Sequence, residues 1–449
     1  MVRVSERESL IAAFRDAGHQ LWLVGGSLRD ELIGRPSADA DYATSALPDE
    51  IETVARNLGH PVSTLGQRFG TVGVLVDGRW SEITTFRGES YSGGTRWPEV
   101  TFGRSIEEDL ARRDFTVNAL ARSAITGETL DRYGGADDLA ARQLRAVGDP
   151  VQRFREDPLR ILRGLRFASQ LDFDIEQGTL AGMTETVELL PTLSQERVTA
   201  ELDKLLLGAN PGRGLALLWR CGALPIVLPE LAAMPGCEQN RFHHFDAWGH
   251  TVATVAAIDP GGDRARIRRW TALLHDVGKP AVRHLKANGE WGFYRHDAVG
   301  AEIVGDLLRR LLLGRRDALV IQLLVRRHMD RPNPEDRRSV RRFMSRCEGL
   351  WEDLLALKRA DNASHTYDDT AYHAALDAAC RSVAEQDAAA LRAESPLTGD
   401  DLIALFEREP GPWIRVVKGR LSAMVLDGDL APGDRAAAER AARSLLGRP

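Results

Sequence analysis

The spacing of apolar residues changes within the chain, and this change limits the folds that are open to it. Up to about residue 145, short strand-like runs such as QLWLVG and TVGVLVDG alternate with helical runs such as ERESLIAAFRDAG. From Glu156 onward nearly every segment has helical spacing, and Gly, Pro and Asn separate the segments. The sequence therefore predicts an α+β fold in which a small mixed sheet with helices precedes a largely α-helical remainder, with a boundary at 145–150.

Length and composition indicate an ordinary globular protein. The chain has 449 residues, which suits two to four domains. We find no apolar run of about eighteen residues that could span a bilayer, and the charged N-terminus MVRVSERESL indicates a helix rather than a signal peptide. The four cysteines form no C-x-x-C pair, so we expect reduced, buried thiols. We therefore expect a cytoplasmic protein with no membrane partner; the sequence leaves its oligomeric state open.

The charge is unevenly distributed along the chain. The formal net charge is -6, which by itself argues against a nucleic-acid partner. Three segments are nonetheless rich in arginine and nearly free of lysine: RRDFTVNALAR, FREDPLRILRGLRFA and RRHMDRPNPEDRRSVRRFM. The planar guanidinium suits phosphates and base edges, although a codon bias towards arginine explains the Arg/Lys ratio equally well.

Two carboxylates lie close together in the predicted strand DADYAT. Asp39 and Asp41 are two residues apart, so their side chains leave the same face of that strand. Paired hard oxygen ligands suit Mg²⁺, and a two-metal site of this kind supports phosphoryl or nucleotidyl transfer. For the pair alone, a polar surface turn is the simpler interpretation.

A glycine pair precedes these carboxylates. Gly25 and Gly26 end a strand and open a helix whose first turn carries Ser27 and Arg29, so backbone N–H groups, helix dipole and guanidinium can meet one anion. The spacing is neither that of a P-loop nor G-x-G-x-x-G. Phosphate ligands on one side and metal ligands on the other predict a nucleoside triphosphate as the shared ligand.

Three further motifs carry a family resemblance. GGSLRDELIG with the following DAD, RRDFTVNALA at 112–121 and EDPLRILRGLRFA at 156–168 resemble, in order and spacing, the class II tRNA nucleotidyltransferase and bacterial poly(A) polymerase family. The likeness continues through ERVTAELDKLL and GLALLWRCGALPIVLPEL and covers roughly the first half of the chain closely. It implies four domains: a nucleotidyltransferase palm or head in 1–147, a helical neck in 148–238, an HD-type body in 239–365 and a helical tail in 366–449.

The resemblance also implies roles for individual residues. Asp39 and Asp41 would hold the catalytic Mg²⁺ ions, with Glu82 as a candidate third carboxylate unless it simply occupies an exposed strand face. The implied nucleotide-binding residues are Gly25, Gly26, Arg29, Arg113, Asp157, Arg160, Arg163 and Arg166.

Within this set, Asp157 and Arg160 would read the base. At i and i+3 we expect them to share a helix face, where the carboxylate accepts from the exocyclic amine of C or A and the guanidinium donates to neighbouring ring acceptors. An intrahelical salt bridge is the plainer alternative. Arg163 and Arg166 continue along the helix and could bind the triphosphate of the same nucleotide.

The second half of the chain contains an HD-like signature. HHFDAWGH at 243–250 and TALLHDVGKP at 271–280 resemble the HD phosphohydrolases. The candidate metal ligands are His250, His275, Asp276, His296, His328 and Asp361. Such a set suits a second divalent transition metal and water activation for phosphoester hydrolysis, or else the fold serves only as a scaffold that binds RNA.

Together these resemblances predict an enzyme that adds CCA to the 3′ end of tRNA from CTP and ATP without a template. Neck, body and tail would hold the tRNA acceptor arm, and a glycine-rich mobile loop at 88–103 would help the change from C to A addition. Alternatives within the class are a poly(A) polymerase and an enzyme that adds only CC or only A. Outside it stand an HD phosphohydrolase with a nucleotide-sensing head and a non-catalytic RNA-binding protein.

Overall fold

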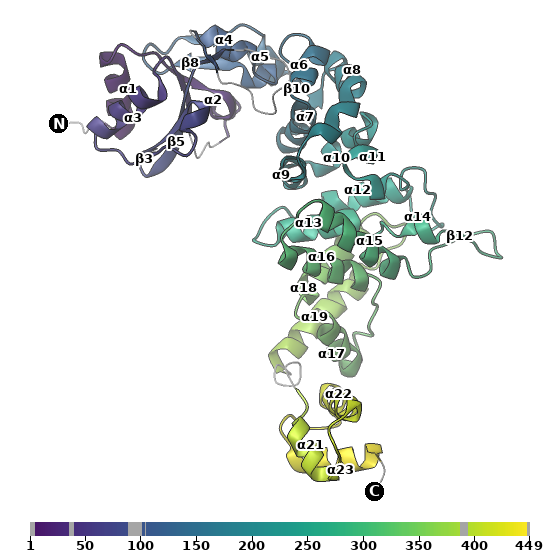
Figure 1. Ribbon diagram of the computed structural model, residues 1–449. Coiled ribbons are helices and arrows are strands. Elements are labelled where there is room, and N and C mark those ends of the chain that lie inside the picture. The colour runs from purple at the N-terminus through teal and green to yellow at the C-terminus, as the bar shows by residue number, and fades with distance from the viewer. Residues whose placement is uncertain (1–4, 36–39, 89–100, 104, 387–393, 447–449) are drawn as a thin grey trace. The chain divides into compact units, whose positions relative to one another are not determined.

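The computed structural model describes residues 5–35, 40–88, 101–103, 105–386 and 394–446 (Figure 1). It contains two compact units, residues 1–227 and 228–449. The predicted head and the predicted neck up to residue 227 therefore belong to the same compact unit, and residues 228–238 of the predicted neck belong to the second. The α+β fold class predicted from the sequence is confirmed: a mixed sheet with helices lies at the N-terminus and helices dominate the remainder.

The first unit begins with a seven-stranded sheet in the order β3-β4-β5-β2-β1-β8-β9. Its strands are β1 (Leu21–Val24), β2 (Asp41–Thr44), β3 (Val62–Ser63), β4 (Thr71–Val76), β5 (Arg79–Thr85), β8 (Leu120–Ser123) and β9 (Thr129–Asp131). Strands β2 and β5 are parallel, and the other neighbouring pairs are antiparallel.

Helices cover both faces of this sheet. On one face, α1 (Glu6–Asp16) and α3 (Pro48–Asn57) contribute buried apolar side chains to a core that includes Tyr42 of β2. On the other face, α4 (Ile106–Ala111) packs against Ala43. Side chains alternate along a strand, so Asp41 points to the same face as Ala43.

A tight hairpin joins β4 to β5. Its two-residue turn is Asp77-Gly78, with φ of +50° and +73°, and Val76 pairs with Arg79 across it. Positive φ at both central positions is the requirement of a type I′ turn, which matches the twist of the strands and favours Asp-Gly. The turn therefore fixes the register of β5.

The predicted loop at 88–103 is largely outside the described residues. Its described ends form two short strands, β6 (Arg87–Gly88) and β7 (Thr101–Phe102), which pair in antiparallel fashion. The switching role that we assign to this segment remains a prediction.

The rest of the first unit is mainly helical. Its helices and the two-stranded pair β10–β11 are α2 (Gly25–Leu32), α5 (Gly135–Ala140), α6 (Pro150–Glu156), α7 (Leu159–Leu171), α8 (Gln177–Thr186), α9 (Gln195–Leu206), α10 (Pro211–Arg220), α11 (Leu224–Val227), β10 (Gln143–Leu144) and β11 (Asp174–Ile175). Helix α7 packs against α9 and α10, and Gly208 and Gly214 allow close contact with the buried Ser169.

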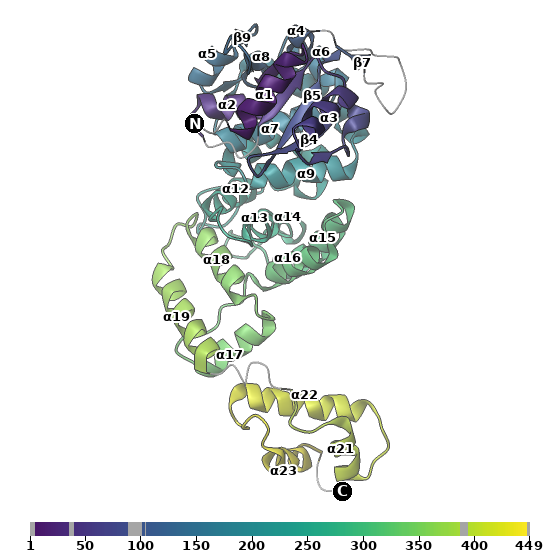
Figure 2. The same cartoon turned by 90° about the vertical axis from the view of Figure 1, so that its left-hand side faces the viewer.

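The second unit is almost wholly helical (Figure 2). Its elements are α12 (Ala247–Ala257), α13 (Ala265–Leu274), α14 (Lys279–Val282), β12 (His284–Leu285), β13 (Trp291–Gly292), α15 (His296–Arg310), α16 (Arg315–Arg327), α17 (Arg337–Arg346), α18 (Trp351–Asn362), α19 (Thr370–Gln386), α21 (Gly399–Phe406), α22 (Pro412–Asp427) and α23 (Arg435–Leu446). The last three helices share an apolar core around Leu402, Leu421 and Ala438. None of the described helices is both long and apolar enough to cross a membrane. All four cysteines are buried free thiols, as the sequence predicts.

Candidate active site

A cavity of about 670 Å³ opens where α2, the β2–β5 pair and α7 meet in the first unit. We call it the head cavity. Among the residues that line it are Gly25, Gly26, Arg29, Asp41, Glu82, Thr84, Arg87, Asp109, Arg112, Arg113, Asp114, Asn118, Asp157, Arg160, Arg163, Arg166, Phe167 and Arg197. All eight residues predicted to bind the nucleotide are in this set, although they come from segments far apart in the sequence.

Two carboxylates face this cavity from neighbouring parallel strands. Asp41 of β2 is in register with Glu82 of β5, so both side chains leave the same face of the sheet. The backbone N–H of Asp41 donates to Ser27 Oγ at 2.9 Å, which ties the carboxylate-bearing strand to the first turn of α2. Asp39 lies outside the described residues. Glu82, considered from the sequence only as a candidate, thus stands beside Asp41.

The start of α2 shows why glycine is needed at position 25. Gly25 has a φ of +66°, and a Cβ at this position would lie 2.9 Å from Arg113 Nη1. Arg113 donates to Asp109 Oδ2 from Nε at 3.2 Å and from Nη2 at 3.0 Å. Burial opposes ionisation of Asp109, but Arg113 and Arg112 outweigh it and lower the pKa of this carboxyl. Glycine therefore lets a carboxylate-held guanidinium approach the helix start.

Arg29 is buried in the wall of the head cavity. Only 7% of it is exposed, and its Nη1 donates to Asn118 Oδ1 at 2.8 Å. Its Nη2 pairs with Asp30 Oδ1 at 2.8 Å. A Cβ on Gly26 would lie 3.6 Å from Arg29 Nη2, an ordinary contact. The guanidinium is thus fixed in place before any ligand is bound.

The sequence-based geometry for Asp157 and Arg160 is wrong. Helix α6 ends at Glu156, Asp157 is extended with φ -145°, and α7 begins only at Leu159. The residue before a proline is disfavoured in the α region, and Pro158 explains the break. Asp157 and Arg160 therefore do not share a helix face, yet both line the head cavity.

Each member of this pair has a different partner instead. Arg160 donates to Glu156 Oε2 at 3.1 Å and to the Arg112 carbonyl at 2.9 Å. Asp157 accepts from Arg197 Nη2, whose distances to its two oxygens are 3.3 and 3.2 Å. Arg197 is half exposed on α9 and was missed from the sequence, although ERVTAELDKLL belongs to the family resemblance.

The other two arginines of α7 are paired with buried carboxylates. Arg163 Nε and Nη2 lie 2.7 and 2.6 Å from Asp114 Oδ2. Burial would raise the pKa of Asp114, but Arg163 and the hydrogen bond from Asn118 hold this pKa below its ordinary value. Arg166 pairs with Glu201 of α9 at 3.0 Å. Both arginines line the cavity. Their contact with the triphosphate remains a prediction.

Charge in the head cavity is unbalanced. Among its described lining residues, eight arginines face five carboxylates. Several of these arginines are held by carboxylates behind them, so the cavity has fixed positive charge with little reorganisation needed on binding. Such a surface suits a polyanion whose negative charges meet guanidinium groups on one side and carboxylate-bound cations on the other.

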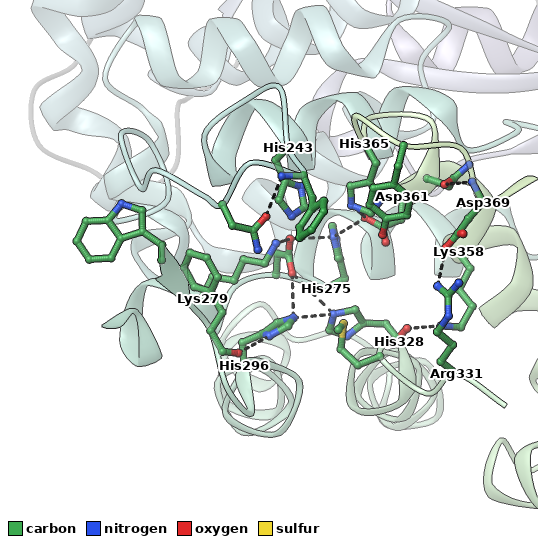
Figure 3. A pocket seen from close by; sticks show the side chains of 18 of the residues that line it. His243, His275, Lys279, His296, His328, Arg331, Lys358, Asp361, His365 and Asp369 are labelled. Atoms are coloured by element: carbon green, nitrogen blue, oxygen red, sulfur yellow. Dashed lines mark hydrogen bonds and ion pairs between the residues drawn. The ribbon is translucent and has the colours of Figure 1, made fainter. Parts of the chain in front are cut away.

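A second cluster of site residues lies in the second unit. All six predicted metal ligands meet here, from within or directly after α12, α13, α15, α16 and α18: His250, His275, Asp276, His296, His328 and Asp361. We call them the HD cluster. Five of them line a cavity of about 310 Å³, and His275, His296 and His328 point toward one another in it (Figure 3).

Asp276 is the centre of the HD cluster. Its Oδ2 lies 3.4 Å from His250 Nε2 and 3.2 Å from His275 Nε2. Its Oδ1 lies 3.3 Å from His296 Nε2 and 3.7 Å from His328 Nε2. Asp276 is 2% exposed, so one buried carboxylate separates two pairs of histidines.

The ring orientation of these histidines suits a cation. Nδ1 of His275, His296 and His328 is 2.7 to 2.8 Å from the carbonyls of Ala272, Phe293 and Val325. A ring that donates its Nδ1–H in this way presents the Nε2 lone pair inward, as metal-binding histidines do. The Nε2 atoms of His296 and His328 are only 3.0 Å apart, where two lone pairs repel unless a cation or a proton lies between them.

The electrostatics of the HD cluster, like the orientation of its rings, favour a cation. Burial disfavours imidazolium at His275, but Asp276 and Asp361 outweigh it and raise the pKa of His275 to about 10. Burial lowers the pKa of His328 to about 4. The HD cluster therefore favours positive charge at His275 beside its carboxylates, whereas the ring of His328 stays neutral.

Two further histidines beside the HD cluster were missed from the sequence. His243 and His365 also line the cavity, and each can form a ligand group with His250. The backbones of His243 and His365 are joined by a β-bridge. His243 belongs to HHFDAWGH, so that motif offered a signal; nothing in the sequence joins it to His365.

The sheet places carboxylates of neighbouring strands beside a cationic cavity, and helices of the neck follow the sheet in the chain. This arrangement is that of a nucleotidyltransferase. Family comparisons agree along the chain. Residues 21–145 match "Poly A polymerase head domain", residues 172–234 match "Probable RNA and SrmB-binding site of polymerase A", and residues 249–365 match "HD domain".

Comparison with whole proteins is more specific. The CCA-adding enzyme of Enterococcus faecalis is 33% identical over 436 residues, which cover 95% of this chain and 92% of that protein. The chain belongs to the CCA-adding enzyme family. The crystal structure of the Bacillus stearothermophilus CCA-adding enzyme in complex with CTP has a TM-score of 0.74 at 26% identity, covering 98% of both chains. The Thermotoga maritima CCA-adding enzyme complexed with tRNA has a TM-score of 0.59 at 19% identity over 98% of this chain and 94% of that one, a likeness of fold alone.

Proposed function

We propose that this chain adds C, C and A in turn to the 3′ end of tRNA, taking CTP and ATP and releasing pyrophosphate. The observation that carries the proposal is the head cavity, where paired strand carboxylates face eight arginines within a family of CCA-adding enzymes. The tRNA 3′-hydroxyl attacks the α-phosphorus, and the bond to the β-phosphate oxygen breaks. The neck at 148–238 and the tail at 366–449 are proposed to bind the acceptor arm.

The carboxylates fit a divalent cation, for which we propose Mg²⁺. Asp41 and Glu82 present oxygen ligands from neighbouring strands, and Asp39 is the further ligand predicted from the sequence. When bound, the metal would neutralise phosphate charge and favour ionisation of the attacking hydroxyl. The chain itself supplies positioning: Arg29 and Arg113, each held by a carboxylate, bind the triphosphate opposite the carboxylates.

Base selection is proposed to depend on Asp157 and Arg160. Asp157 accepts from the exocyclic amine of C or A, and Arg160 donates to a ring acceptor beside it. Uracil and guanine do not offer that amine at the same place. Arg160 is fixed by Glu156 and by the Arg112 carbonyl, so it reads the base as a rigid donor.

The decisive experiment counts the nucleotides added. Labelled CTP or ATP is offered with Mg²⁺ to tRNAs that end at the discriminator base, at C and at CC. Stepwise C, C, A followed by arrest supports the proposal. An unlimited A tract would instead identify a poly(A) polymerase, and arrest after CC or addition of A alone would identify the partial enzymes.

We infer a second function, phosphoester hydrolysis at the HD cluster. The observation that favours it over a scaffold is the inward orientation of the Nε2 atoms around Asp276. Imidazole nitrogens with buried carboxylates fit a divalent transition metal, which when bound would activate water. In the chain itself, Asp276 and Asp361 hold charge at the cluster, and Lys279, 2.6 Å from Asp276, neutralises part of it.

This second function is tested with a generic phosphodiester, bis-p-nitrophenyl phosphate, and Mn²⁺, Co²⁺ or Ni²⁺ in turn. We expect metal-dependent hydrolysis that His275→Ala abolishes while nucleotide addition to tRNA continues. If no metal supports hydrolysis by the unsubstituted protein, the scaffold interpretation replaces this one.

A further inference from the structure

Phe167 lies in the wall of the head cavity, yet no role follows for it from the motif that contains it. It belongs to α7, is 6% exposed and lines the cavity. Its ring meets Phe115 edge to face, with 6.0 Å between the centroids and an interplanar angle of 84°. This contact fixes the plane of the ring from behind.

Three guanidinium groups gather around this ring. The Cζ atoms of Arg29, Arg163 and Arg166 lie 5.3, 5.5 and 4.1 Å from its centroid. Arg29 comes from α2 beside the sheet, whereas the other two belong to α7. Like charges repel at this spacing, and the negative face of an aromatic ring offsets that repulsion where water is scarce.

The same arginines are also linked through hydrogen bonds. Arg29 Nη1 donates to Asn118 Oδ1 at 2.8 Å, and Asn118 Nδ2 donates to Asp114 Oδ1 at 3.0 Å. Arg163 Nε donates to Asp114 Oδ2 at 2.7 Å. The contacts with Phe167 close this chain into a ring that joins α2 to α7, so the aromatic side chain sets the spacing between Arg29 and Arg163.

We propose that Phe167 is a positioning residue for the nucleotide: it holds the three guanidinium groups at the spacing that receives the phosphates of CTP and ATP. The inference rests on the proposed nucleotidyl transfer in the head cavity. Phe167 acts through the arginines. It therefore affects the binding of both CTP and ATP and not the selection of one over the other.

An aromatic ring that only fills the core gives different results from one that holds cations. Phe173 offers a matched control, because it is also buried, at 4% exposed, and has one guanidinium, Arg142, at 5.8 Å. It does not line the head cavity among the residues that the structure describes. Phe167→Leu and Phe173→Leu remove similar apolar volume, so a loss of packing affects both.

The experiment measures KM and kcat for CTP and ATP on the full chain. We expect Phe167→Leu to raise KM for both nucleotides about tenfold, because two or three partly desolvated cation–π contacts are lost. Phe167→Tyr should restore KM, and Phe173→Leu should leave it unchanged while lowering the unfolding temperature. Equal KM effects at the two positions, or none at Phe167, would overturn the proposal.

A second measurement keeps the test independent of folding. Mono-, di- and trifluorinated phenylalanine at position 167 keep the shape of the ring and progressively weaken its negative face. KM should rise in step with fluorination at 167 and stay constant with the same series at 173. A flat series at 167 would overturn the role of Phe167 alone, whereas absence of incorporation by the unsubstituted protein would overturn the proposed nucleotidyl transfer.

Discussion

The head cavity and the HD cluster achieve preorganisation by different means. In the head cavity, several arginines are held by carboxylates, and the proposed nucleotide and its metal would complete the site. In the HD cluster, backbone carbonyls turn the Nε2 atoms of His275, His296 and His328 inward, and the six predicted ligands already converge. Arginine side chains are long, and their guanidinium groups need partners to hold them, whereas one hydrogen bond fixes the orientation of an imidazole ring. We therefore expect the head cavity to depend on the residues that hold its arginines. The HD cluster should depend instead on its six predicted ligands.

The largest expected effect comes from removing a carboxylate of the head cavity. Asp41→Ala should lower nucleotide incorporation by on the order of 10³-fold, because charge stabilisation of the transferred phosphoryl group is lost. Single-turnover transfer of labelled CMP to tRNA measures it. The hydrolysis proposed for the HD cluster should not change, and the exposed Asp137→Ala on α5 is the control. Incorporation within about tenfold of normal would contradict the role of Asp41.

The corresponding change in the HD cluster should leave nucleotide addition intact. Asp276→Asn keeps the shape of the side chain but removes the charge between the two histidine pairs. We expect the affinity for Mn²⁺ or Ni²⁺, measured by calorimetry, to fall by about a hundredfold. Asp306→Asn on α15, at an aspartate whose side chain is 81% exposed, is the control. Loss of tRNA nucleotide addition in Asp276→Asn would break the independence of the two sites.

A smaller effect is expected on selectivity. Asp157→Ala should lower the preference for CTP over UTP by roughly tenfold to a hundredfold, the discrimination carried by one bidentate base contact. Arg197→Ala should have a weaker effect in the same direction, because Arg197 donates to the Asp157 carboxylate and helps to hold it. Competition between labelled CTP and UTP gives both ratios. An unchanged ratio in Asp157→Ala would remove its assigned role.

The smallest effect tests how the sheet is tied to α2. Ser27→Ala removes the acceptor of the Asp41 backbone N–H, a contact that contributes about 1 kcal/mol. We expect kcat to fall severalfold with KM for CTP nearly unchanged, and Ser27→Thr to retain activity. Steady-state kinetics on tRNA ending in C would measure both. A rise in KM alone would instead place Ser27 among the ligands of the triphosphate.

Local patterns in the sequence predicted the residue types of both sites better than their geometry. The six predicted ligands of the HD cluster lie together in the structure, as do the predicted cavity arginines, while their roles stay predictions. The shared helix face of Asp157 and Arg160 was not, because Pro158 turns the chain at the decisive point. Two further residues reach the site through non-local contacts. Arg197 of α9 contacts Asp157, and Glu82 is in register with Asp41 on the neighbouring parallel strand. Such pairings are set by tertiary packing, which spacing along one segment does not reveal.

The hairpin turn Asp77-Gly78 gives the enzyme an unusual vulnerability. It sets the register of β5 and therefore decides which side chain stands next to Asp41. An insertion of one residue there would bring Ser81 or Ile83 into the place of Glu82 and reverse the two faces of the strand. Most surface turns accept length variation during evolution, whereas this one is expected to resist it. A change of length far from any substrate would act here as a change of active-site chemistry.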